Sequence, residues 1–285
     1  MTDYQTARVS LGVRLRALRD EAGLSGRELA MRLAWHPSKV SKLEHGKQTA
    51  SAEDLRSWAQ VCGRGEAADG LLAQRRSLET HYASWRRQLA GGHAARQVAN
   101  RGLDERTRNF RVFEAACVPG LLQTAEYARF MFSRGVRLHR SPDDGGAAVK
   151  ARIERQRILD LPEKTFRILV WEPALRLRLC PDTAMIDQLS RVVQEIAWER
   201  ADIGVIPLGA ALDVVPSHGF WIFDDSRVLV ETIGAELCLT DGDAISPYQR
   251  VFAELSRAAV RGHAARRLVE GIRRDLAGNA SPPRW

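Results

Sequence analysis

Hydrophobic residues recur at helical spacing through the first sixty residues of the chain. In the first segment they fall on one face, at i, i+4, i+7 and i+11: Leu11, Leu15, Leu18 and Ala22. This stripe predicts a helix over residues 10–22, with Arg14, Arg16 and Arg19 pointing elsewhere. Comparable stripes predict three further helices, at 26–33, at 37–46 and from Ser51 to about residue 62, and Leu71, Leu72 and Leu78 indicate one more at 66–78.

Capping residues mark the ends of these helices. Ser25 is followed three residues later by Glu28, the capping-box spacing that opens a helix. Pro37 suits the first position of the third helix, because the N–H that proline lacks would have no partner there. Gly23 and Gly46 follow the first and third helices, and a glycine commonly ends a helix in this way. The pattern therefore predicts a wholly helical N-terminal segment.

Strand-forming residues appear only after Pro162. The segment FRILVW at 166–171 is rich in β-branched and aromatic residues and predicts a strand. Four shorter strands are predicted at 203–207, 220–223, 228–233 and 237–240. Tight turns separate the last three, so we expect a small antiparallel sheet. Helices are predicted at 149–160, 182–201, 245–260 and 263–276.

The helical pattern of the N-terminal part and the mixed helix and strand pattern of the C-terminal part indicate two domains of different class. We expect a mainly α domain over 1–80 and an α+β domain over 111–277, with a small antiparallel sheet. A polar, arginine-rich segment over 81–110 is predicted to connect them as a basic linker. Residues 278–285 are predicted to form a loose tail.

The net charge changes the picture because it is unevenly distributed. The 285 residues include 43 Lys and Arg against 35 Asp and Glu, a formal net charge of +8. Residues 1–80 carry a net +3 and 81–110 a net +4, whereas 166–260 carry a net −6. Such asymmetry is typical of a nucleic-acid-binding head joined to a body with another role. The alternative is an arginine-rich composition whose charges are scattered without function.

Several classes of protein are excluded or disfavoured. No apolar run approaches the roughly 18 residues that a membrane span needs, and the N-terminus lacks the apolar region of a signal peptide. The four cysteines, at 62, 117, 180 and 238, have neither metal nor redox spacing. We therefore expect a reduced, cytoplasmic and nucleoid-associated protein with no membrane partner.

The helices at 26–33 and 37–46 have the spacing of a helix-turn-helix DNA reader. The second of these helices turns Val40 and Leu43 inward. Its remaining side chains are short hydroxyls, lysines and a histidine, all suited to base edges or phosphates: Ser38, Lys39, Ser41, Lys42 and His45. Glu44 falls beside Leu43 and is predicted to have an internal partner. The alternative is a small helical bundle with an ordinary solvated face.

The run from Leu11 to Gly63 resembles the Xre, or lambda-repressor, type of helix-turn-helix domain. Its most specific piece is SKVSKLEHGK at 38–47, which is similar to the recognition helix and exit turn of that family. The resemblance implies a lambda-repressor-like fold, with Ser38, Lys39, Ser41 and Lys42 facing DNA and Lys47 meeting phosphate. Gly26 stands where the family often has glutamine, and Arg27 is the candidate to replace that contact.

The remainder of the chain resembles one family of actinobacterial regulators, the Scr1/WhiJ-like proteins. The resemblance rests on FRVFEAACVPGLLQTAEYAR, ARIERQRIL and RILVWEPALRL, with VPGLLQ at 118–123 the most distinctive piece. It implies a transcriptional regulator with a long C-terminal domain of poorly assigned function, often acting with a small partner protein. It supplies no established ligand or catalytic residue that could be assigned to positions of this sequence.

Other candidate chemistry is weak. The seven histidines form no HxxxH pair and lie away from the cysteines, so no metal site is predicted. Glu172, Asp213 and the Ser217–His218 pair are predicted to be solvated turn or loop residues rather than catalytic groups. Trp171, Trp198, Phe220 and Trp221 are interpreted as core residues, the alternative being a ligand pocket. The basic helix at 150–157 is interpreted as an exposed face, the alternative being a phosphate patch.

These observations favour a sequence-specific DNA-binding transcriptional regulator without catalytic residues, metal or cofactor. We expect a homodimer on a palindromic operator of double-stranded DNA, since one small head discriminates poorly between sites. The C-terminal domain would provide dimerisation and sense a small-molecule effector or a small acidic partner protein. Two alternatives remain: an antitoxin-like interaction module controlled by such a partner, and an enzyme domain tethered to DNA.

Overall fold

A computed structural model describes residues 3–278, and the chain divides into two compact units, Met1–Ala83 and Ser84–Trp285. The tail predicted at 278–285 lies outside the described residues except for Gly278, which ends the last helix. Within residues 3–278 there is no helix of the length and apolarity that a bilayer crossing requires.

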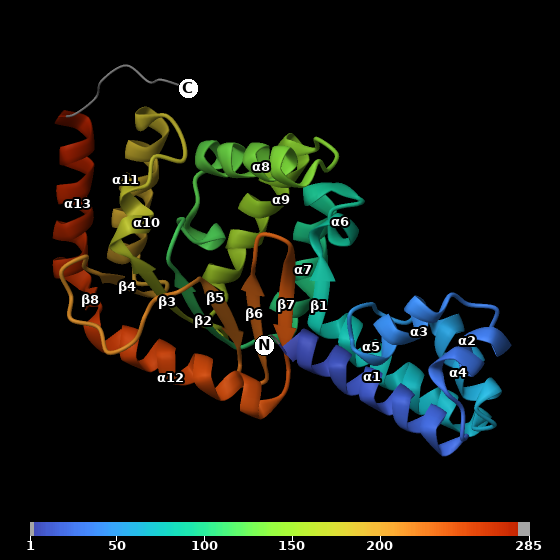
Figure 1. Ribbon diagram of the computed structural model, residues 1–285. Coiled ribbons are helices and arrows are strands. Elements are labelled where there is room, and N and C mark those ends of the chain that lie inside the picture. Colours follow the sequence, from blue (N-terminus) through green and yellow to red (C-terminus); the bar gives the residue numbers. More distant parts are fainter. Residues whose placement is uncertain (1–2, 279–285) are drawn as a thin grey trace. The chain divides into compact units, whose positions relative to one another are not determined.

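The first unit is helical, as the hydrophobic pattern predicted (Figure 1). Its helices are α1 (Asp3–Glu21), α2 (Gly26–Arg32), α3 (Pro37–Glu44), α4 (Ala52–Val61) and α5 (Ala68–His81), with a short 3-10 turn, η1, at Gly65–Ala67. Leucines of α1 pack with Leu29, Val40, Leu55 and Trp58 in one core. The Trp58 indole N–H donates to the Leu15 carbonyl at 3.0 Å, so this aromatic ring is satisfied as well as buried.

Two details of this unit differ from the predictions. Helix α1 begins at Asp3 rather than at residue 10, because polar residues at a helix start leave no hydrophobic signal. Arg19 does not point away from the core but is 8% exposed. A spacing argument sees only the apolar stripe, whereas Arg19 is buried because a later helix supplies its partner.

The second unit combines helices on both faces of a mixed sheet (Figure 1). Its strands in chain order are β2 (Asn109–Glu114), β3 (Thr165–Trp171), β4 (Asp202–Ile206), β5 (Phe220–Phe223), β6 (Arg227–Glu231), β7 (Ala235–Leu239) and β8 (Val260–Arg261). In space they follow the order β7-β6-β5-β2-β3-β4-β8. A short strand, β1 (Tyr82–Ser84), lies where the two units divide.

The helices of this unit cover both faces of the sheet. They are α6 (Trp85–Gln88), α7 (Gly92–Arg106), α8 (Ala125–His139), α9 (Gly145–Arg155), α10 (Glu172–Arg176), α11 (Asp182–Trp198), α12 (Gly242–Ala258) and α13 (Gly262–Gly278), with 3-10 turns η2 (Gly120–Leu122) and η3 (Gln156–Asp160). Ile168 and Val170 of β3 pack towards residues of α11 and α13. Leu169, on the opposite face, packs towards α12. The alternation of β3 therefore separates two cores.

The prediction of a small antiparallel sheet for this unit is wrong in both the size of the sheet and the direction of its strands. Strands β5, β6 and β7 do form the expected antiparallel meander. Strands β2, β3 and β4, however, are parallel, with Val112 opposite Ile168 and Ile168 opposite Ile203. Parallel partners lie dozens of residues apart and are joined by helical crossovers, so no local turn announces them.

The segment 81–110, predicted as a basic linker, is largely structured and belongs mostly to the second unit. It contains α6, α7 and the start of β2. Helix α7 buries Gln97 and Asp104, which are 5% and 1% exposed. The prediction treated polar residues as solvated, whereas here they face partners on other helices.

Candidate nucleic-acid interface

Helices α2 and α3 are opened by the residues that the sequence singled out. The Ser25 backbone N–H donates to the Glu28 carboxylate at 2.7 Å, and the Glu28 N–H donates to the Ser25 hydroxyl at 3.2 Å. Pro37 occupies the first turn of α3, and the His36 imidazole accepts from the Ser38 N–H at 3.3 Å. Both predicted starts are confirmed, so each helix has a defined first residue.

Close backbone contacts fix α3 against α1. A methyl group added at Gly12 would lie 2.4 Å from the Glu44 carbonyl oxygen, so only glycine permits this approach. Gly46 adopts φ +60°, and a methyl group there would lie 2.9 Å from Val9. Val40 and Leu43 are each 2% exposed on the inner side of α3. These contacts define which side of α3 faces outward.

An ion pair holds the C-terminal end of α3. The Arg19 guanidinium donates to both Glu44 oxygens, at 2.6 and 3.1 Å, and to the Leu24 carbonyl at 2.8 Å. Both side chains are less than a tenth exposed. The bond with Glu44 raises the pKa of Arg19. Glu44 has the internal partner that was predicted, and its negative charge is therefore neutralised beside the outward face.

Most of the predicted DNA-contacting residues lie on the surface of the first unit. The exposed members are Arg27, Ser38, Ser41, Lys42, His45 and Lys47. His45 is oriented by its own helix, because its Nδ1 lies 2.7 Å from the Ser41 carbonyl oxygen and must donate there. That tautomer leaves Nε2 as the acceptor of the neutral ring.

Lys39 is the exception among the predicted contacts. Its ammonium donates to Asp54 at 2.7 Å and lies 3.8 Å from the centre of the Trp35 ring. Burial opposes ionisation of Asp54, but the bonds from Lys39 and Ser51 outweigh it and lower the pKa of that carboxyl. Lys39 therefore links α3 to the start of α4, and a role in DNA contact stays a prediction.

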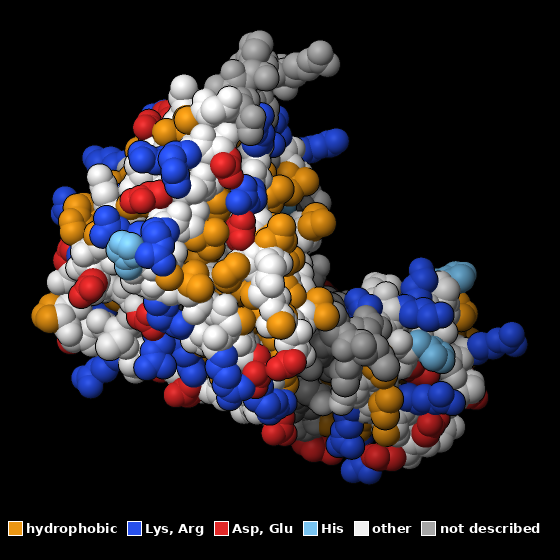
Figure 2. All heavy atoms as spheres, turned by 90° about the vertical axis from the view of Figure 1, so that its left-hand side faces the viewer, with side chains coloured by type: hydrophobic (Ala, Val, Ile, Leu, Met, Phe, Trp, Pro, Cys, Tyr) orange, Lys and Arg blue, Asp and Glu red, His pale blue; other side chains and the backbone are white. Residues whose placement is uncertain are grey.

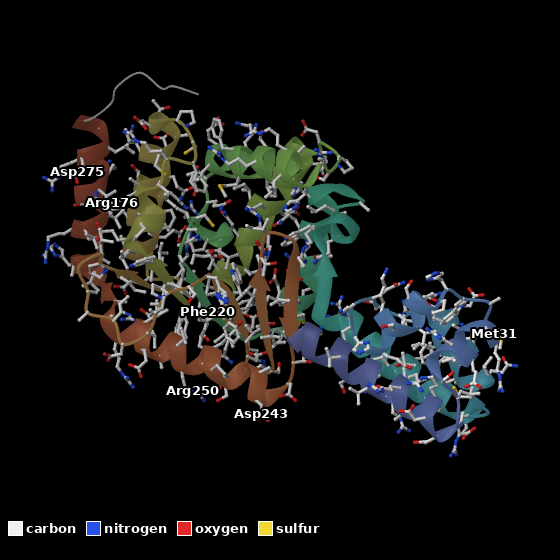
Figure 3. The ribbon with its side chains drawn as sticks, in the orientation of Figure 1. Met31, Arg176, Phe220, Asp243, Arg250 and Asp275 are labelled. Atoms are coloured by element: carbon white, nitrogen blue, oxygen red, sulfur yellow. The ribbon has the colours of Figure 1, made fainter. Side chains whose placement is uncertain are left out.

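Sequence reasoning missed other features of this surface. Arg32 and Gln48, at the ends of α2 and of the turn after α3, are exposed beside the predicted set. Met31 is 75% exposed and is labelled on α2 in Figure 3. Within residues 26–47 there are five basic and two acidic residues, and the two acidic ones are Glu28 and Glu44. Glu44 is paired with Arg19, whereas Glu28 is exposed and keeps its negative charge. The exposed basic residues still outnumber it, so the outward charge of this segment is predominantly basic.

The candidate catalytic residues of the second unit have structural partners. The buried Glu172 carboxylate accepts from the Arg176 guanidinium at 2.6 Å and from the Leu208 N–H at 2.7 Å. Arg176 also reaches Asp275 at 3.5 Å, which ties α10 to α13 (Figure 3). The prediction that Glu172 is solvated is wrong, because it is 6% exposed and connects elements of the fold.

The remaining weak candidates are also accounted for. Ser217 donates to the Val215 carbonyl, while the His218 ring stacks on Tyr248 with centroids 5.9 Å apart. Among the side chains that the structure describes, at 8–75, 85 and 88–278, no group of three His, Cys, Asp or Glu could hold a metal ion. Trp221 borders a cavity rather than lying wholly in the core, and Trp198 is 54% exposed.

The second unit has no strongly basic face on the side that carries α13. Figure 2 shows basic, acidic and apolar side chains interspersed there. Many of its arginines are paired, for example Arg261 with Asp202 and Arg176 with Glu172.

Different family models match the N-terminal and C-terminal parts of the chain, in agreement with its division into two units. No curated protein matches the sequence. Among solved structures the chain is similar to TrmBL2, described as an archaeal chromatin protein whose structure shows a novel mode of DNA binding. That similarity has 13% identity and a TM-score of 0.31, over 84% of this chain and 88% of TrmBL2. The score is too low to establish a shared fold.

Two family models match parts of the chain. A helix-turn-helix domain model matches residues 10–69, which contain α2 and α3. A model described as a domain of unknown function, DUF5753, matches residues 100–271, which is more than half of the chain. The protein therefore belongs to the DUF5753 family and carries a helix-turn-helix domain ahead of that domain.

Proposed function

We propose that this protein is a transcriptional regulator that binds specific sequences of double-stranded DNA through α2 and α3. In this proposal α3 enters the major groove and presents Ser38, Ser41 and Lys42 to base edges. Arg27 and Lys47 contact phosphates on either side. Phosphate contacts provide affinity and register, and base contacts provide sequence specificity.

The observation that carries the proposal is the outward face of α3. That face combines short hydroxyls and basic side chains, and its one acidic residue is bonded to Arg19. A helix held on its inner side by glycine contacts and a buried ion pair is pre-organised, so little ordering opposes DNA binding. A solvated helix of a simple bundle needs no such fixation of one end.

We further propose that the protein acts as a homodimer on a palindromic operator. One helix-turn-helix head contacts few base pairs, and two heads whose half-sites lie one helical turn apart multiply the discrimination. The DUF5753 domain would supply the contact between protomers and sense an effector or a small partner protein. The Glu172 carboxylate accepts hydrogen bonds from Arg176 and from the Leu208 N–H. This structural use of the carboxylate favours a regulatory over a catalytic role for the domain.

The resemblance of VPGLLQ and its neighbouring segments to the Scr1/WhiJ-like regulators supports an actinobacterial, Xre-type assignment. On that assignment the small acidic partner protein is the natural alternative to a small-molecule effector. Co-purification from the native host tests it directly. If the co-purified partner protein leaves DNA affinity unchanged, it is not a regulator of DNA binding.

The test of DNA recognition is the variant Lys42→Ala, measured on sites selected from random duplexes. We expect specific-site binding to weaken by about 1–3 kcal/mol, with a smaller slope of log affinity against log salt. Fluorescence anisotropy over a salt series measures both quantities. The selected sequences also give the half-site spacing, which a dimer fixes near one helical turn.

Lys150→Ala is the matched control for charge. Lys150 is exposed on α9 of the second unit, so the variant loses the same positive charge away from the predicted interface. It should leave affinity and salt slope nearly unchanged. Equal effects of the two variants, or none from Lys42→Ala, would mean that α3 is not the recognition helix.

A further inference from the structure

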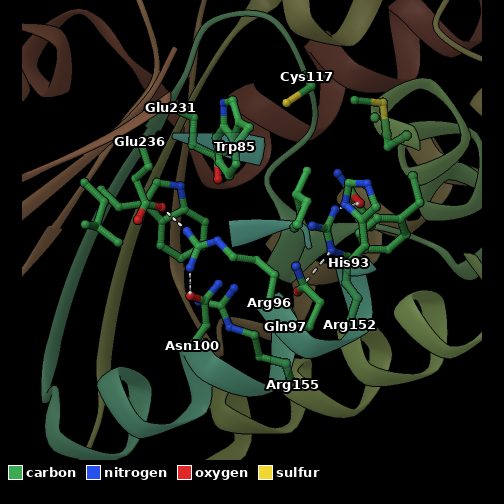
Figure 4. A pocket seen from close by; sticks show the side chains of 18 of the residues that line it. Trp85, His93, Arg96, Gln97, Asn100, Cys117, Arg152, Arg155, Glu231 and Glu236 are labelled. Carbon is green, nitrogen blue, oxygen red and sulfur yellow. Dashed lines mark hydrogen bonds and ion pairs between the residues drawn. The ribbon is translucent and has the colours of Figure 1, made fainter. Parts of the chain in front are cut away.

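A cavity of about 230 Å³ lies within the second unit. Helices α6, α7, α8 and α9 and strands β2, β5, β6 and β7 all contribute lining residues (Figure 4). Its apolar lining includes Trp85, Met131, Phe132 and Trp221. Polar groups converge on the same space, which is the usual combination in a small-molecule site.

Three arginines border this cavity, and two of them have a carboxylate partner. Arg155 donates to both oxygens of Asp104, at 2.5 and 2.9 Å, and Asp104 is 1% exposed. Arg96 donates to the buried carboxylate of Glu236 (Figure 4). These two guanidinium groups are therefore neutralised by the protein itself.

Arg152 is the third arginine and differs from the others. It donates to the side-chain oxygens of Gln123 at 2.7 Å and Gln97 at 3.5 Å, and lies 4.3 Å from the centre of the Phe132 ring. No carboxylate among the described residues lies within 4 Å of its nitrogens. Burial lowers the pKa of Arg152 to about 10, so the group stays charged at neutral pH. Amide oxygens satisfy its hydrogen bonds, and the acids that act on it across the cavity, Glu231 and Glu114, form no direct ion pair with it.

The distinctive segment VPGLLQ forms the support for Arg152. Gln123 donates to the Val118 carbonyl at 2.7 Å while its oxygen accepts from Arg152. Gln156 then donates to the Gly120 and Gln123 carbonyls, at 3.0 and 2.7 Å. The bonds hold the segment in one conformation and fix the guanidinium at the cavity wall.

Another part of the cavity wall is fixed as well. Asp144 accepts from the backbone N–H groups of His93 and Ala94, at 3.0 and 2.7 Å, and so holds the start of α7. The His93 ring packs against Gly135, where an added methyl group would lie 2.8 Å from the ring. Burial lowers the pKa of His93, which keeps the ring neutral. The cavity therefore exists before any ligand arrives.

We propose that this cavity binds a small monocarboxylate with an apolar or aromatic body, whose carboxylate pairs with Arg152. The planar guanidinium fork matches a carboxylate geometrically. The body of the ligand would pack against Phe132, Trp221 and Met131. A monoanion fits better than a phosphate dianion, because Glu231 lines the same cavity and repels a second negative charge.

The assignment of this ligand as the effector rests on the proposed function, whereas its binding does not. The two are therefore measured separately. Binding is followed on the full chain without DNA, and the effect on DNA affinity is followed afterwards on the selected operator. Failure of the Lys42→Ala test would remove the DNA role and leave the carboxylate site standing.

Isothermal titration calorimetry with a defined panel tests the site. The panel contains acetate, benzoate, phenylacetate and indole-3-acetate, each compared with its uncharged amide. We expect at least one aromatic carboxylate to bind the wild-type chain, with its amide about tenfold weaker or worse. Absence of binding by all four carboxylates, or equal binding by an amide, would overturn the proposal.

Variants identify the residue responsible. Arg152→Gln should weaken carboxylate binding about tenfold or more, whereas Arg157→Gln, which removes the same charge from an exposed position on η3, should not. Gln97→Glu is the second variant, because it is isosteric, keeps Arg152 and gives it an internal counterion. It should weaken binding similarly, while Gln60→Glu on the surface of α4 should have no effect. Unchanged binding by Gln97→Glu would show that Arg152 does not hold the ligand.

Discussion

Two arginines, one in each unit, show how differently the same group is used. Arg19 of the first unit donates to both oxygens of Glu44 and to the Leu24 carbonyl. These bonds hold the C-terminal end of α3 in place. Arg152 of the second unit is held by neutral amides and an aromatic ring, and borders a cavity. A paired buried arginine stabilises a scaffold, whereas one that borders a cavity without a direct ion pair indicates a place for an anion.

The first prediction removes the partner from the paired arginine. Glu44→Ala removes the buried carboxylate of Arg19 and leaves it only the exposed Asp20, at 2.5 Å. Breaking a buried pair typically destabilises a fold by about 3–5 kcal/mol, and the remaining bond to Asp20 places the expected cost at the lower end of that range. Hydrogen-exchange mass spectrometry of peptides within residues 10–46 should show faster exchange across α1 and α3. If α3 recognises DNA as proposed, DNA binding should be lost with it, because the end of α3 is no longer held.

Glu53→Ala provides the comparison for this variant. Glu53 is exposed in the first turn of α4, so its removal should cost no more than about 1 kcal/mol of helix-end stabilisation. Similar exchange rates in the two variants would mean that the Arg19–Glu44 pair adds nothing beyond a surface charge.

The second prediction concerns a buried acid in the unit that contains Arg152. Burial raises the pKa of Glu114 to about 7, although hydrogen bonds from Trp221 and Cys117 favour the charged form. The other charged groups that act on Glu114 are Glu231, which raises the pKa, and Arg152, which lowers it. Between pH 4.5 and 7 the folded protein therefore holds a proton that the unfolded chain has released.

Stability must accordingly fall as pH rises through this window. At about 1.4 kcal/mol for each pKa unit, ionisation of Glu114 accounts for about 3 kcal/mol of lost unfolding free energy by pH 8. Glu114→Gln should remove that part of the decline and be more stable than wild type at pH 8. Urea unfolding at pH 5 and pH 8 measures the difference.

Two further side chains complete this experiment. Glu236 also has its pKa raised to about 7 by burial, so part of the decline should persist in Glu114→Gln. Glu105→Gln changes an exposed carboxyl and should follow the wild-type pH dependence. A Glu114→Gln variant with the full wild-type decline would place the titrating group elsewhere.

Residues close together in the sequence were enough to predict the helices of the first unit. Ser25 with Glu28, and Pro37 at the start of α3, act on backbone groups within a single turn, so their spacing contains the information. The inward turn of Val40 and Leu43 followed from helical periodicity in the same way.

The candidate cavity could not be predicted on the same grounds. Arg152 and Arg155 resembled the exposed face of a basic helix, but their partners Gln97 and Asp104 lie more than fifty residues earlier. Strand β2, whose charged residues alternate with apolar ones, was missed because its parallel neighbour β3 begins far along the chain. Contacts between residues far apart in the sequence decide which polar residues are buried, and these contacts cannot be predicted from a single sequence.

The smallest predicted effect concerns Lys39, where sequence and structure suggest different roles. In the structure Lys39 donates to Asp54 and lies over Trp35, whereas Lys42 on the same helix is exposed. A double-mutant cycle with Lys39→Met and Asp54→Asn should give a coupling of about 0.5–1 kcal/mol in urea unfolding. Asparagine keeps a capping acceptor for Ser51, so the cycle isolates the ion pair.

The same variant distinguishes a structural lysine from one that contacts DNA. If Lys39 only joins α3 to α4, Lys39→Met leaves the salt slope of DNA binding at its wild-type value, while Lys42→Ala reduces it. A reduction of the slope by about one in both variants would mean that Lys39 exchanges Asp54 for a phosphate when DNA binds. In that case Asp54 would hold the Lys39 ammonium only in the free protein, and a phosphate would replace it in the complex. Each unit would then contain a basic side chain available to an external anion, Lys39 in the first and Arg152 in the second.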